Sequence, residues 1–428
     1  MGLIDDVLKF TSRVLYYVDR YSLSLDKAYQ YAKHSLGLSS VERAPKFFYE
    51  ISRDVVSKFI QLDLLCRRYN IAPTYKNIVR LWLLLYGEDV IRLNAVRHYV
   101  KRLRKRFRDL DLSSVIEEVK GVERLAIEYS FPLQFVKRLS SVLPLEEVER
   151  LLKSLNSNIL WLRVNTLKFD VDRAIKVLEE EGVLVEVDHD FEFMLRVVKY
   201  DKPLHKLSVV REGKVIIQDK ASAFAVRALD PKPGDVILDL CAAPGVKTSL
   251  IMQLTENRAK VIAFDKSRKR LRSMIRLLKL YGVDVSRVDI VLTDSRVIRW
   301  VANVDSILVD APCTSSGVVC RDPAVKVHLR RLTKVEHYSQ IQLELLRNAL
   351  RWIPVGTPVI FTTCSLLPDE GEEVVKRVIS GEVLAEVAPL DLPVATGYPG
   401  YLFSSSVRRT FPHIHHCGGF FYCKLVRI

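Results

Sequence analysis

The stretch "VILDLCAAPGVKTSL", residues 236–250, contains the clearest strand-turn-helix pattern in the chain. Its first residues are apolar and predict a strand, small residues and a proline then predict a tight turn, and the residues from 246 onward predict a helix. In an open parallel sheet, ligands bind beyond the carboxyl ends of the strands. The sequence therefore predicts a ligand-binding turn made of Cys241, Ala242, Ala243, Pro244, Gly245, Val246 and Lys247.

Strands and helices alternate around this stretch. Short apolar runs that predict strands lie at 235–240, 260–265, 288–294, 305–310 and 357–365, and helical spacing occurs at 247–255, 267–282 and 337–352. Such alternation predicts a parallel sheet with helices on both faces. The run 418–428 predicts one more strand. We expect residues 211–428 to form an α/β, Rossmann-like domain.

Two other regions precede this domain. Residues 1–140 predict an all-helical domain: between 94 and 112 the apolar residues fall three or four apart, on one face, as Val96, Val100, Leu103, Phe107 and Leu110. Arginines and lysines lie between them, and this basic face is either an RNA-binding surface or an ordinary solvated one. Residues 141–210 predict a linker helix and a small α+β subdomain, which is too short to bury a large core alone.

Length, charge and cysteine content narrow the classes of function that this protein can have. The chain has 428 residues and a net charge of +15, which favours a polyanionic partner, most simply nucleic acid, with solubility alone as the alternative. No apolar run reaches the length of a membrane span, and acidic residues near the start argue against an export signal. The seven cysteines are scattered and odd in number, which favours a reducing cytosol over a disulfide framework. We expect a cytoplasmic monomer.

Acidic residues at strand ends indicate the cofactor. Asp265 ends the strand that follows the turn, where a carboxylate can bind both hydroxyls of a ribose, and Asp294 and Asp310 end the next two strands. Each alone can be a cap or turn residue. The turn lacks the glycines of a phosphate-binding loop or a dinucleotide fingerprint. S-adenosylmethionine fits best, because it has a ribose and a sulfonium but no phosphates.

Two cysteines lie just past strand ends on the same edge of the predicted sheet: Cys313 in "SILVDAPCTSSG" and Cys364 in "FTTCSLLPDEGEE". Either thiolate can attack a carbon electrophile. C5 of cytosine is too weak a nucleophile to take a methyl group directly, whereas a thiolate added at C6 activates it. One cysteine would attack and a second group would assist release, while Asp310 is placed to act as an acid near N3.

At this point several runs resemble a known family. "VIIQDKASAFA", "DLCAAPGVKT", "DAPCTSSG" and "TCSLLPDEGEE" resemble, in this order, signature runs of the RNA cytosine-5 methyltransferases of the Sun/Fmu/Nop group. "LNSNILWLRVNTLK" resembles the RRM-like subdomain that precedes the catalytic domain in that family. The helical N-terminus resembles the NusB-like, RNA-binding extension of members that act on ribosomal RNA.

The resemblance implies a role for each candidate residue. Cys364 would be the nucleophile and Cys313 would aid release, while residues 241–247, Asp265, Asp294 and Asp310 would bind S-adenosylmethionine and Arg270 would support that site. Two positions depart from the family pattern. Gly371 stands where the family commonly has an asparagine between two glutamates, and Val246 stands where a second glycine is frequent. The first departure leaves the support around the nucleophile open.

Three hypotheses about the function follow. The resemblance favours a methyltransferase that makes 5-methylcytosine in rRNA or tRNA. A DNA cytosine-5 methyltransferase would use the Pro-Cys cysteine, Cys313, as its nucleophile, and a non-catalytic RNA-binding ribosome-assembly factor would need neither thiol. The run "PHIHHCGGFF" gathers three histidines and a cysteine, but their spacing is too tight for the usual zinc ligands. We expect no metal site there and interpret the run as a loop facing the substrate.

Overall fold

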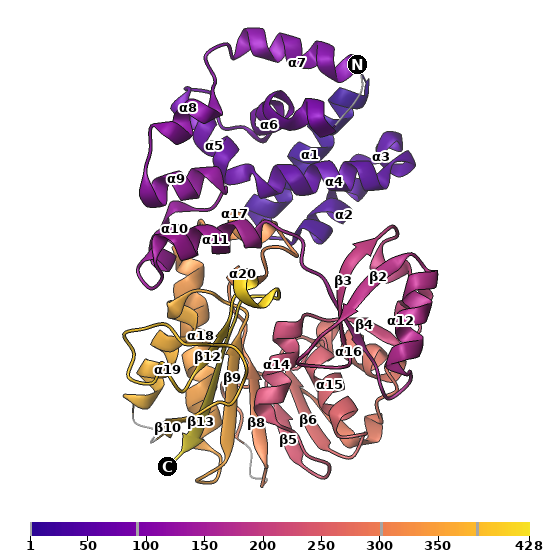
Figure 1. The fold of residues 1–428 in the computed structure, drawn as a ribbon, viewed down its shortest axis with the longest axis vertical. Helices are drawn as coiled ribbons and strands as arrows, with labels where there is room; N and C mark the ends of the chain where they lie inside the picture. Colours follow the sequence, from indigo (N-terminus) through magenta and orange to yellow (C-terminus); the bar gives the residue numbers. More distant parts are fainter. Residues whose placement is uncertain (1, 91–93, 300–302, 382–384) are drawn as a thin grey trace. The chain divides into compact units, whose positions relative to one another are not determined.

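The protein, shown as a computed structural model in Figure 1, is described over residues 2–90, 94–299, 303–381 and 385–428. It divides into two compact units. The helical unit contains residues 1–157 and 319–334, and the catalytic unit contains residues 158–318 and 335–428. Within the described residues, no helix combines the length and the apolar character needed to cross a membrane.

The helical unit is built around one apolar core, to which Phe10, Val14, Phe48 and Trp82 contribute. Capping residues separate its helices: Ser24 accepts a hydrogen bond from the Lys27 amide at the start of α2, which ends at Gly37 in the left-handed conformation. The helices are α1 (Gly2–Tyr21), α2 (Leu25–Leu36), α3 (Ser39–Arg43), α4 (Pro45–Ser57), α5 (Phe59–Arg68), α6 (Tyr75–Val90), α7 (Asn94–Arg106), α8 (Leu112–Glu117), α9 (Gly121–Glu128), α10 (Leu133–Ser140), α11 (Leu145–Leu155) and α17 (Ala324–His328).

Two parts of this unit lie outside the range 1–140 expected for the helical domain. Helix α11, expected as a linker, packs against α9 and α10. Helix α17 comes from the predicted catalytic domain, yet the buried Lys326 side chain donates hydrogen bonds to the carbonyl oxygens of Ser57, at 3.0 Å, and Tyr129, at 3.1 Å. No local pattern predicts this second placement, because it depends on contacts between residues almost 200 or more positions apart.

The catalytic unit begins with a small antiparallel sheet in the order β2-β3-β1-β4. Its elements are β1 (Trp161–Val164), α12 (Val171–Glu180), β2 (Val183–Val187), β3 (Met194–Tyr200) and β4 (Val215–Ile217). Helix α12 is capped by Asp170, which accepts a hydrogen bond from the Arg173 amide. The sequence predicted the strand-helix-strand-strand succession, but β4 lies beyond the expected boundary at residue 210.

The large sheet has the order β11-β12-β13-β9-β8-β5-β6-β7, with β10 beside β13. The pairs from β9 to β7 are parallel, as predicted, and β13 runs antiparallel to β9. The strands are β5 (Val236–Asp239), β6 (Lys260–Asp265), β7 (Val288–Leu292), β8 (Ser306–Asp310), β9 (Pro358–Thr363), β10 (Ala385–Ala388), β11 (Ala395–Thr396), β12 (Arg408–Thr410) and β13 (Phe420–Arg427).

Helices cover both faces of this sheet (Figure 1). Adjacent strand residues alternate between the faces: Ile237 packs in one core with α14 (Lys220–Leu229), α15 (Val246–Leu254) and α16 (Arg268–Leu280), and Leu238 packs in the other with α18 (Leu332–Arg351) and α19 (Glu372–Ile379). Two short helices, α13 (Ser208–Arg211) and α20 (Pro412–His415), lie in connections. The predicted Rossmann-like α/β fold is confirmed.

Buried polar contacts join the small sheet to the catalytic domain. Arg163 of β1 donates to Ser249 Oγ of α15 at 2.7 Å, and the Gln253 side chain donates to the Val164 carbonyl oxygen at 3.1 Å. The Trp161 indole donates to the His416 carbonyl oxygen at 2.8 Å, in the histidine-rich run before β13. Buried hydrogen bonds of this kind hold the two parts in one arrangement, since breaking them leaves unpaired polar groups.

Candidate active site

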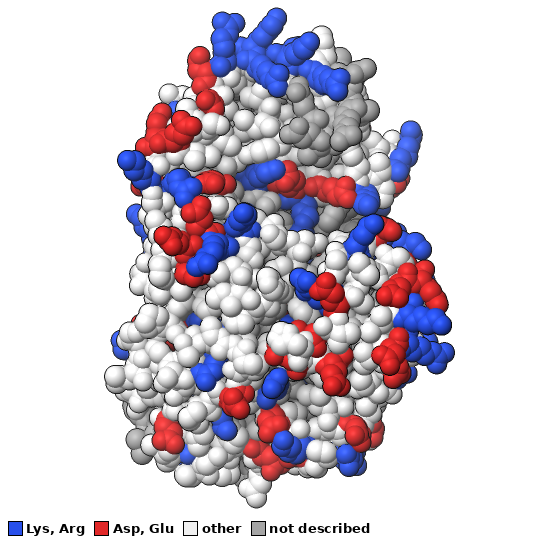
Figure 2. Space-filling model, in the orientation of Figure 1, with Lys and Arg blue, Asp and Glu red and all other residues white. Residues whose placement is uncertain are grey.

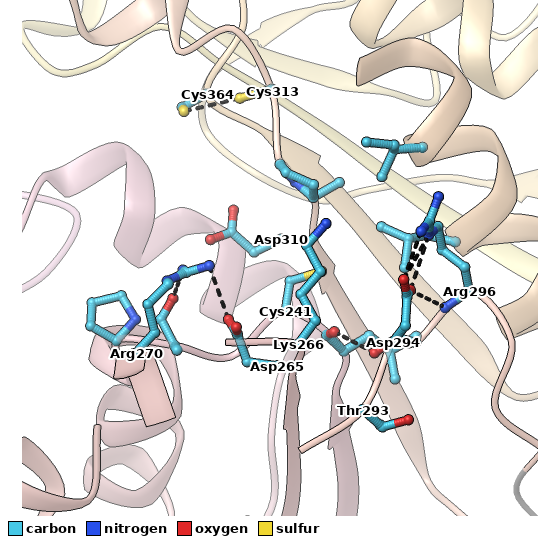
Figure 3. Close-up of a pocket in the computed structure, with 18 of the residues that line it drawn as sticks. Cys241, Asp265, Lys266, Arg270, Thr293, Asp294, Arg296, Asp310, Cys313 and Cys364 are labelled. Carbon is cyan, nitrogen blue, oxygen red and sulfur yellow. Dashed lines mark hydrogen bonds and ion pairs between the residues drawn. The ribbon is translucent and has the colours of Figure 1, made fainter. Parts of the chain in front are cut away.

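A pocket of about 310 Å³ lies past the carboxyl ends of β5, β6, β7 and β8, where a parallel sheet places its ligands (Figure 3). The structure brings nine of the sequence-predicted residues onto its wall: Cys241, Ala243, Pro244, Asp265, Arg270, Asp294, Asp310, Cys313 and Cys364. Lys266, Thr293, Ser295, Arg296, Ser315, Ile341 and Leu345 are among the other lining residues. The pocket therefore combines acidic groups, basic groups and two thiols.

Cys313 and Cys364 meet at one end of this pocket. Their sulfur atoms lie 3.2 Å apart, and both cysteines are free thiols (Figure 3). Cys364 follows β9 and Cys313 follows the neighbouring strand β8, so parallel pairing of these strands brings them together although they are 51 positions apart. The expectation that both thiols converge beside the turn after β5 thus matches the geometry.

The two thiols have different acidities. A hydrogen bond from the Cys313 thiol lowers the pKa of Cys364 against the opposing effect of burial. The Ser315 hydroxyl, whose oxygen lies 3.5 Å from the Cys364 sulfur, adds to this effect. The same hydrogen bond to Cys364, together with burial, raises the pKa of Cys313 well above that of a free thiol. Cys364 is thus the sulfur that ionises first.

Asp265 and Arg270 form one wall of the pocket. The buried carboxylate of Asp265 accepts a hydrogen bond from the Ser267 amide at 2.8 Å and pairs with Arg270 at 3.0 Å. Arg270 also donates to the carbonyl oxygen of Ala243 in the turn after β5. Arg270 therefore ties the strand-end carboxylate to the turn, which is the supporting position that the family resemblance implied.

Asp294 and Asp310 occupy other sides of the pocket, each with a cationic partner. Arg296 pairs with Asp294 at 2.6 Å, which lowers the pKa of Asp294, and also reaches Glu344 at 3.0 Å. Lys247 pairs with Asp310 at 2.6 Å. Both carboxylates thus have a compensating charge at the pocket wall.

Four residues of the predicted turn do not line the pocket: Ala242, Gly245, Val246 and Lys247. Gly245 has a φ of +97°, and a Cβ there would lie 2.7 Å from the Met274 side chain of α16. Gly245 thus permits the turn and the packing of α16, and its approach to a ligand stays a prediction. Lys247 contributes to the site through Asp310.

The departure at Gly371 has a structural reason. A Cβ at this position would lie 2.7 Å from the guanidinium of Arg409 and 3.0 Å from the Phe421 ring. Arg409 is fully buried, pairs with the fully buried Glu372 and donates to the carbonyl oxygen of Ser365 at 3.0 Å. Gly371 therefore makes room for an ion pair that holds the backbone next to Cys364.

Several residues of the site were not predicted from the sequence. Lys266 and Arg296 could have been found, because they lie one and two positions after predicted acidic residues. Ile341 and Leu345 are one helical turn apart in α18 and so share a face, but no local sequence pattern identified that face as the pocket wall.

The histidine-rich run has a structural role in its loop: both ring nitrogens of His415 lie near backbone amides, at 2.9 Å from Phe411 N and 3.3 Å from Ala395 N.

The pocket suits S-adenosylmethionine. Asp265 at the end of β6 is placed for ribose hydroxyls, and the carboxylates Asp294 and Asp310 favour the cationic sulfonium and amino groups. Apolar residues, among them Leu240, Ala311, Ile341 and Leu345, leave room for the adenine ring.

Comparisons with known protein families match most of the catalytic unit. Residues 226–426 match the family described as 16S rRNA methyltransferase RsmB/F, and residues 131–200 match the ferredoxin-like domain of RsmF/B-like methyltransferases. The second match covers most of the small sheet. The two matches thus account separately for the catalytic domain and for the subdomain that precedes it.

Several relatives carry the same description. The chain is 32% identical over 303 residues to ribosomal RNA small subunit methyltransferase B of Klebsiella pneumoniae subsp. pneumoniae, which covers 70% of this chain and 66% of that protein. It is 31% identical to the Escherichia coli O17:K52:H18 protein of that name, over 70% of this chain and 67% of the relative. The matched region thus spans about two thirds of the relatives' length.

Solved structures extend the likeness to the whole chain. The structure of PH0851 is 27% identical, with a TM-score of 0.77 over 98% of this chain and 99% of its own. NSun6 from Pyrococcus horikoshii with SFG is 25% identical, with a TM-score of 0.61 over 68% of this chain and 97% of its own. The fold, the pocket and these matches agree, and the chain belongs to the RsmB/F family of S-adenosylmethionine-dependent 16S rRNA methyltransferases.

Proposed function

We propose that this protein transfers a methyl group to C5 of cytosine in ribosomal RNA through a covalent bond between Cys364 and C6. The observation that carries the proposal is the pair of thiols at the pocket wall, with sulfur atoms 3.2 Å apart and opposite changes in pKa. S-adenosylmethionine, when bound, supplies the electrophilic methyl group. The protein must supply the nucleophile, the proton transfers and the position of the base.

The proposed reaction starts at Cys364. Its thiolate attacks C6, a carbon–sulfur bond forms, and the electron pair of the C5–C6 double bond becomes available at C5 for the methyl group. Asp310 in its protonated form would donate its proton to N3 as the addition proceeds, with Lys247 2.6 Å from its carboxyl group. After methyl transfer, water takes the C5 proton, the electron pair of the C5–H bond restores the C5–C6 double bond and expels the Cys364 thiolate, and N3 returns its proton to Asp310.

Cys313 is proposed to assist this last step. Its sulfur lies within hydrogen-bonding distance of Cys364, and its raised pKa favours the protonated form of Cys313, whereas the lowered pKa of Cys364 favours the Cys364 thiolate. A protonated thiol beside the leaving sulfur stabilises the developing thiolate by donating a hydrogen bond. The opposite assignment, with Cys313 as the nucleophile of a DNA-type enzyme, would require the less acidic of the two sulfurs to ionise and attack.

The ribosomal substrate is proposed from two kinds of support. The matched relatives are described as ribosomal RNA small subunit methyltransferases, and tRNA is the second RNA class to test. Helix α7 presents exposed Arg97, Lys101, Arg102, Arg104, Lys105 and Arg106, with no carboxylate between Asn94 and Arg106. Figure 2 shows this group of basic side chains over α7. Such a face suits the phosphate backbone of RNA.

Trapping on RNA that contains 5-azacytidine tests the chemistry. The nitrogen at position 5 prevents the final elimination, so the attacking cysteine stays bonded to the RNA. We expect a denaturation-resistant adduct with the wild-type protein, none with Cys364→Ala, and a retained or accumulated adduct with Cys313→Ala. The reverse pattern would assign the attack to Cys313. A protein that binds the cofactor but neither forms an adduct nor methylates cellular RNA would support a non-catalytic assembly factor.

A further inference from the structure

Glu370 lies immediately behind the two cysteines, and the reaction described above gives it no role. Its side chain is 0% exposed, and it belongs to the short turn Pro368–Glu370 between β9 and α19. A fully buried carboxylate is rare in proteins unless its charge is compensated or hydrogen-bonded. The hydrogen-bond partners of Glu370 therefore indicate its role.

One side of the carboxylate holds the loop that carries Cys313. The amide of Thr314, the next residue, donates to Oε1 of Glu370 at 2.8 Å, and the Thr314 hydroxyl donates to Oε2. The Gln342 side chain lies 3.4 Å from Oε1 and also donates to the carbonyl oxygen of Pro312 at 2.9 Å. The residues before and after Cys313 are thus both held from the same side.

The other side holds the loop that carries Cys364. The hydroxyl of Ser365, the next residue, donates to Oε2 of Glu370 at 2.6 Å. The hydroxyl of Thr363, the preceding residue, donates to the main-chain oxygen of Glu370 at 3.0 Å. One residue therefore binds the neighbours of both catalytic thiols.

The directions of the hydrogen bonds depend on this carboxylate. Ser365 gives its only hydroxyl proton to Glu370, so in the contact of 3.0 Å between Ser316 and Ser365 the Ser316 hydroxyl must donate. Ser316 in turn accepts a hydrogen bond from the Leu366 amide at 2.9 Å. A neutral amide in place of the carboxylate would turn an N–H group either toward the Thr314 amide, which cannot accept, or toward the hydroxyls of Thr314 and Ser365, which would then have to accept instead of donating, so the direction of this chain would change.

The charge of Glu370 also acts on Cys313. It is among the causes that raise the pKa of Cys313, after the hydrogen bond to Cys364, burial and the charge of Cys364. Burial raises the pKa of Glu370 itself, and the hydroxyl and amide donors of Ser365, Thr314 and Gln342 oppose that rise. The carboxylate therefore favours the protonated form of the thiol that is proposed to assist release.

We infer that Glu370 is the positioning residue of the two-thiol site: it clamps the Cys313 and Cys364 loops at their working separation. Glu370 does not line the pocket, and its contacts reach the thiols through Thr314, Thr363, Ser365 and Gln342. The inference deepens the proposed methyl transfer and rests on it, but its structural part concerns the thiols alone and can be measured without RNA.

The test uses the isosteric variant Glu370→Gln in the full chain. Limiting iodoacetamide at neutral pH, followed by peptide mass spectrometry, gives the ratio of labelling at Cys364 to labelling at Cys313. In the wild type we expect labelling mainly at Cys364, and in Glu370→Gln we expect that ratio to fall at least several-fold.

The methylation kcat of Glu370→Gln should fall about 10- to 100-fold, because small misplacements of reacting groups slow reactions by factors of that size. KM for S-adenosylmethionine should change by less than about two-fold, because Glu370 lies outside the pocket wall.

Two further variants keep the outcome interpretable. Glu373→Gln changes a neighbouring carboxylate whose partner is the Tyr401 hydroxyl at 2.7 Å, and it should leave the labelling ratio and kcat unchanged. If Glu370→Gln fails to fold, Ser365→Ala removes one donor of the clamp and should shift the labelling ratio in the same direction. An unchanged labelling ratio and kcat in the folded variant would overturn the inference. Failure of the proposed function is a separate result, seen as adduct formation that persists in Cys364→Ala.

Discussion

At the scale of single residues, environment makes chemically identical groups different. Cys313 and Cys364 share one hydrogen bond, yet the donor in that bond becomes less acidic and the acceptor more acidic. Burial and three nearby carboxylates raise the pKa of Cys241, which also lines the pocket, so this side chain stays a thiol. Position relative to strand ends predicted which cysteines meet, but the acidity of each depends on contacts that no local pattern contains.

Asp239 gives a residue-scale prediction about pH. It is buried at the end of β5, and burial raises its pKa to about 7, although the Thr248 hydroxyl donates to it at 2.7 Å. The folded state therefore binds this proton more tightly than the unfolded state, so stability falls as pH rises from about 4 through 7. The Asp239→Asn variant should lack this loss. Its free energy of unfolding relative to that of the wild type should therefore rise by about 2–3 kcal/mol from about pH 5 to about pH 8, since one pKa unit corresponds to about 1.4 kcal/mol.

Urea unfolding of both proteins at the two pH values measures this difference. Asp289→Asn, which changes an exposed carboxylate of β7 paired with Lys260, is the matched control and should follow the wild-type curve. A stability difference between Asp239→Asn and wild type that is the same at both pH values would contradict the burial argument.

At the scale of elements, apolar periodicity predicted the alternating strands and helices of the catalytic domain and the helices before it. Strand ends then located the pocket, because parallel strands expose their carboxyl ends at one edge. The elements that periodicity could not place are those whose position depends on distant partners: α17, which packs with the N-terminal helices, and β4, which completes the small sheet. Local patterns could not predict the role of Glu370 for the same reason, since its partners come from three separate segments of the chain.

The contact between α19 and β12 gives an element-scale prediction. Arg409 of β12 pairs with Glu372 at the start of α19, and both side chains are 0% exposed. Arg409→Met would leave a buried carboxylate without its partner and should destabilise the protein by about 3–5 kcal/mol. The double variant Arg409→Met, Glu372→Gln should lose less free energy of unfolding than the single variant, because it has no unpaired buried carboxylate.

Denaturant unfolding of the single and double variants provides the measurement. Arg408→Met is the control on the same strand, since Arg408 donates to nearby main-chain oxygens at the surface, and it should cost less than about 1 kcal/mol, as surface substitutions usually do. Equal destabilisation by Arg408→Met and Arg409→Met would show that the buried pair has no special role.

At the scale of the whole molecule, the net charge of +15 predicts a nucleic-acid partner, and the folded helical unit shows where part of that charge gathers. Charge counts alone cannot distinguish a binding face from a solvated one. The arrangement on α7 can be tested as a surface, because its basic residues lie on one helix that contains no acidic residue.

Replacing Arg97, Lys101 and Lys105 of α7 by glutamine should weaken RNA binding and flatten its salt dependence, by about 0.7–0.9 in the logarithmic slope for each phosphate that is no longer neutralised. A titration of RNA affinity against salt concentration measures both effects. Replacing Lys27, Lys33 and Lys46 by glutamine removes the same charge elsewhere on the helical unit and should leave the slope unchanged. Equal effects of the two triple variants would mean that α7 acts only through net charge.

The cysteine that bonds to the RNA distinguishes the proposed mechanism from its alternatives. Wild-type protein trapped on 5-azacytidine RNA is digested with protease and nuclease, and mass spectrometry locates the modified peptide. The two-thiol mechanism predicts a nucleotide attached to Cys364, with Cys313 unmodified 3.2 Å away. A nucleotide on Cys313, or on neither cysteine while methyl transfer proceeds, would contradict it.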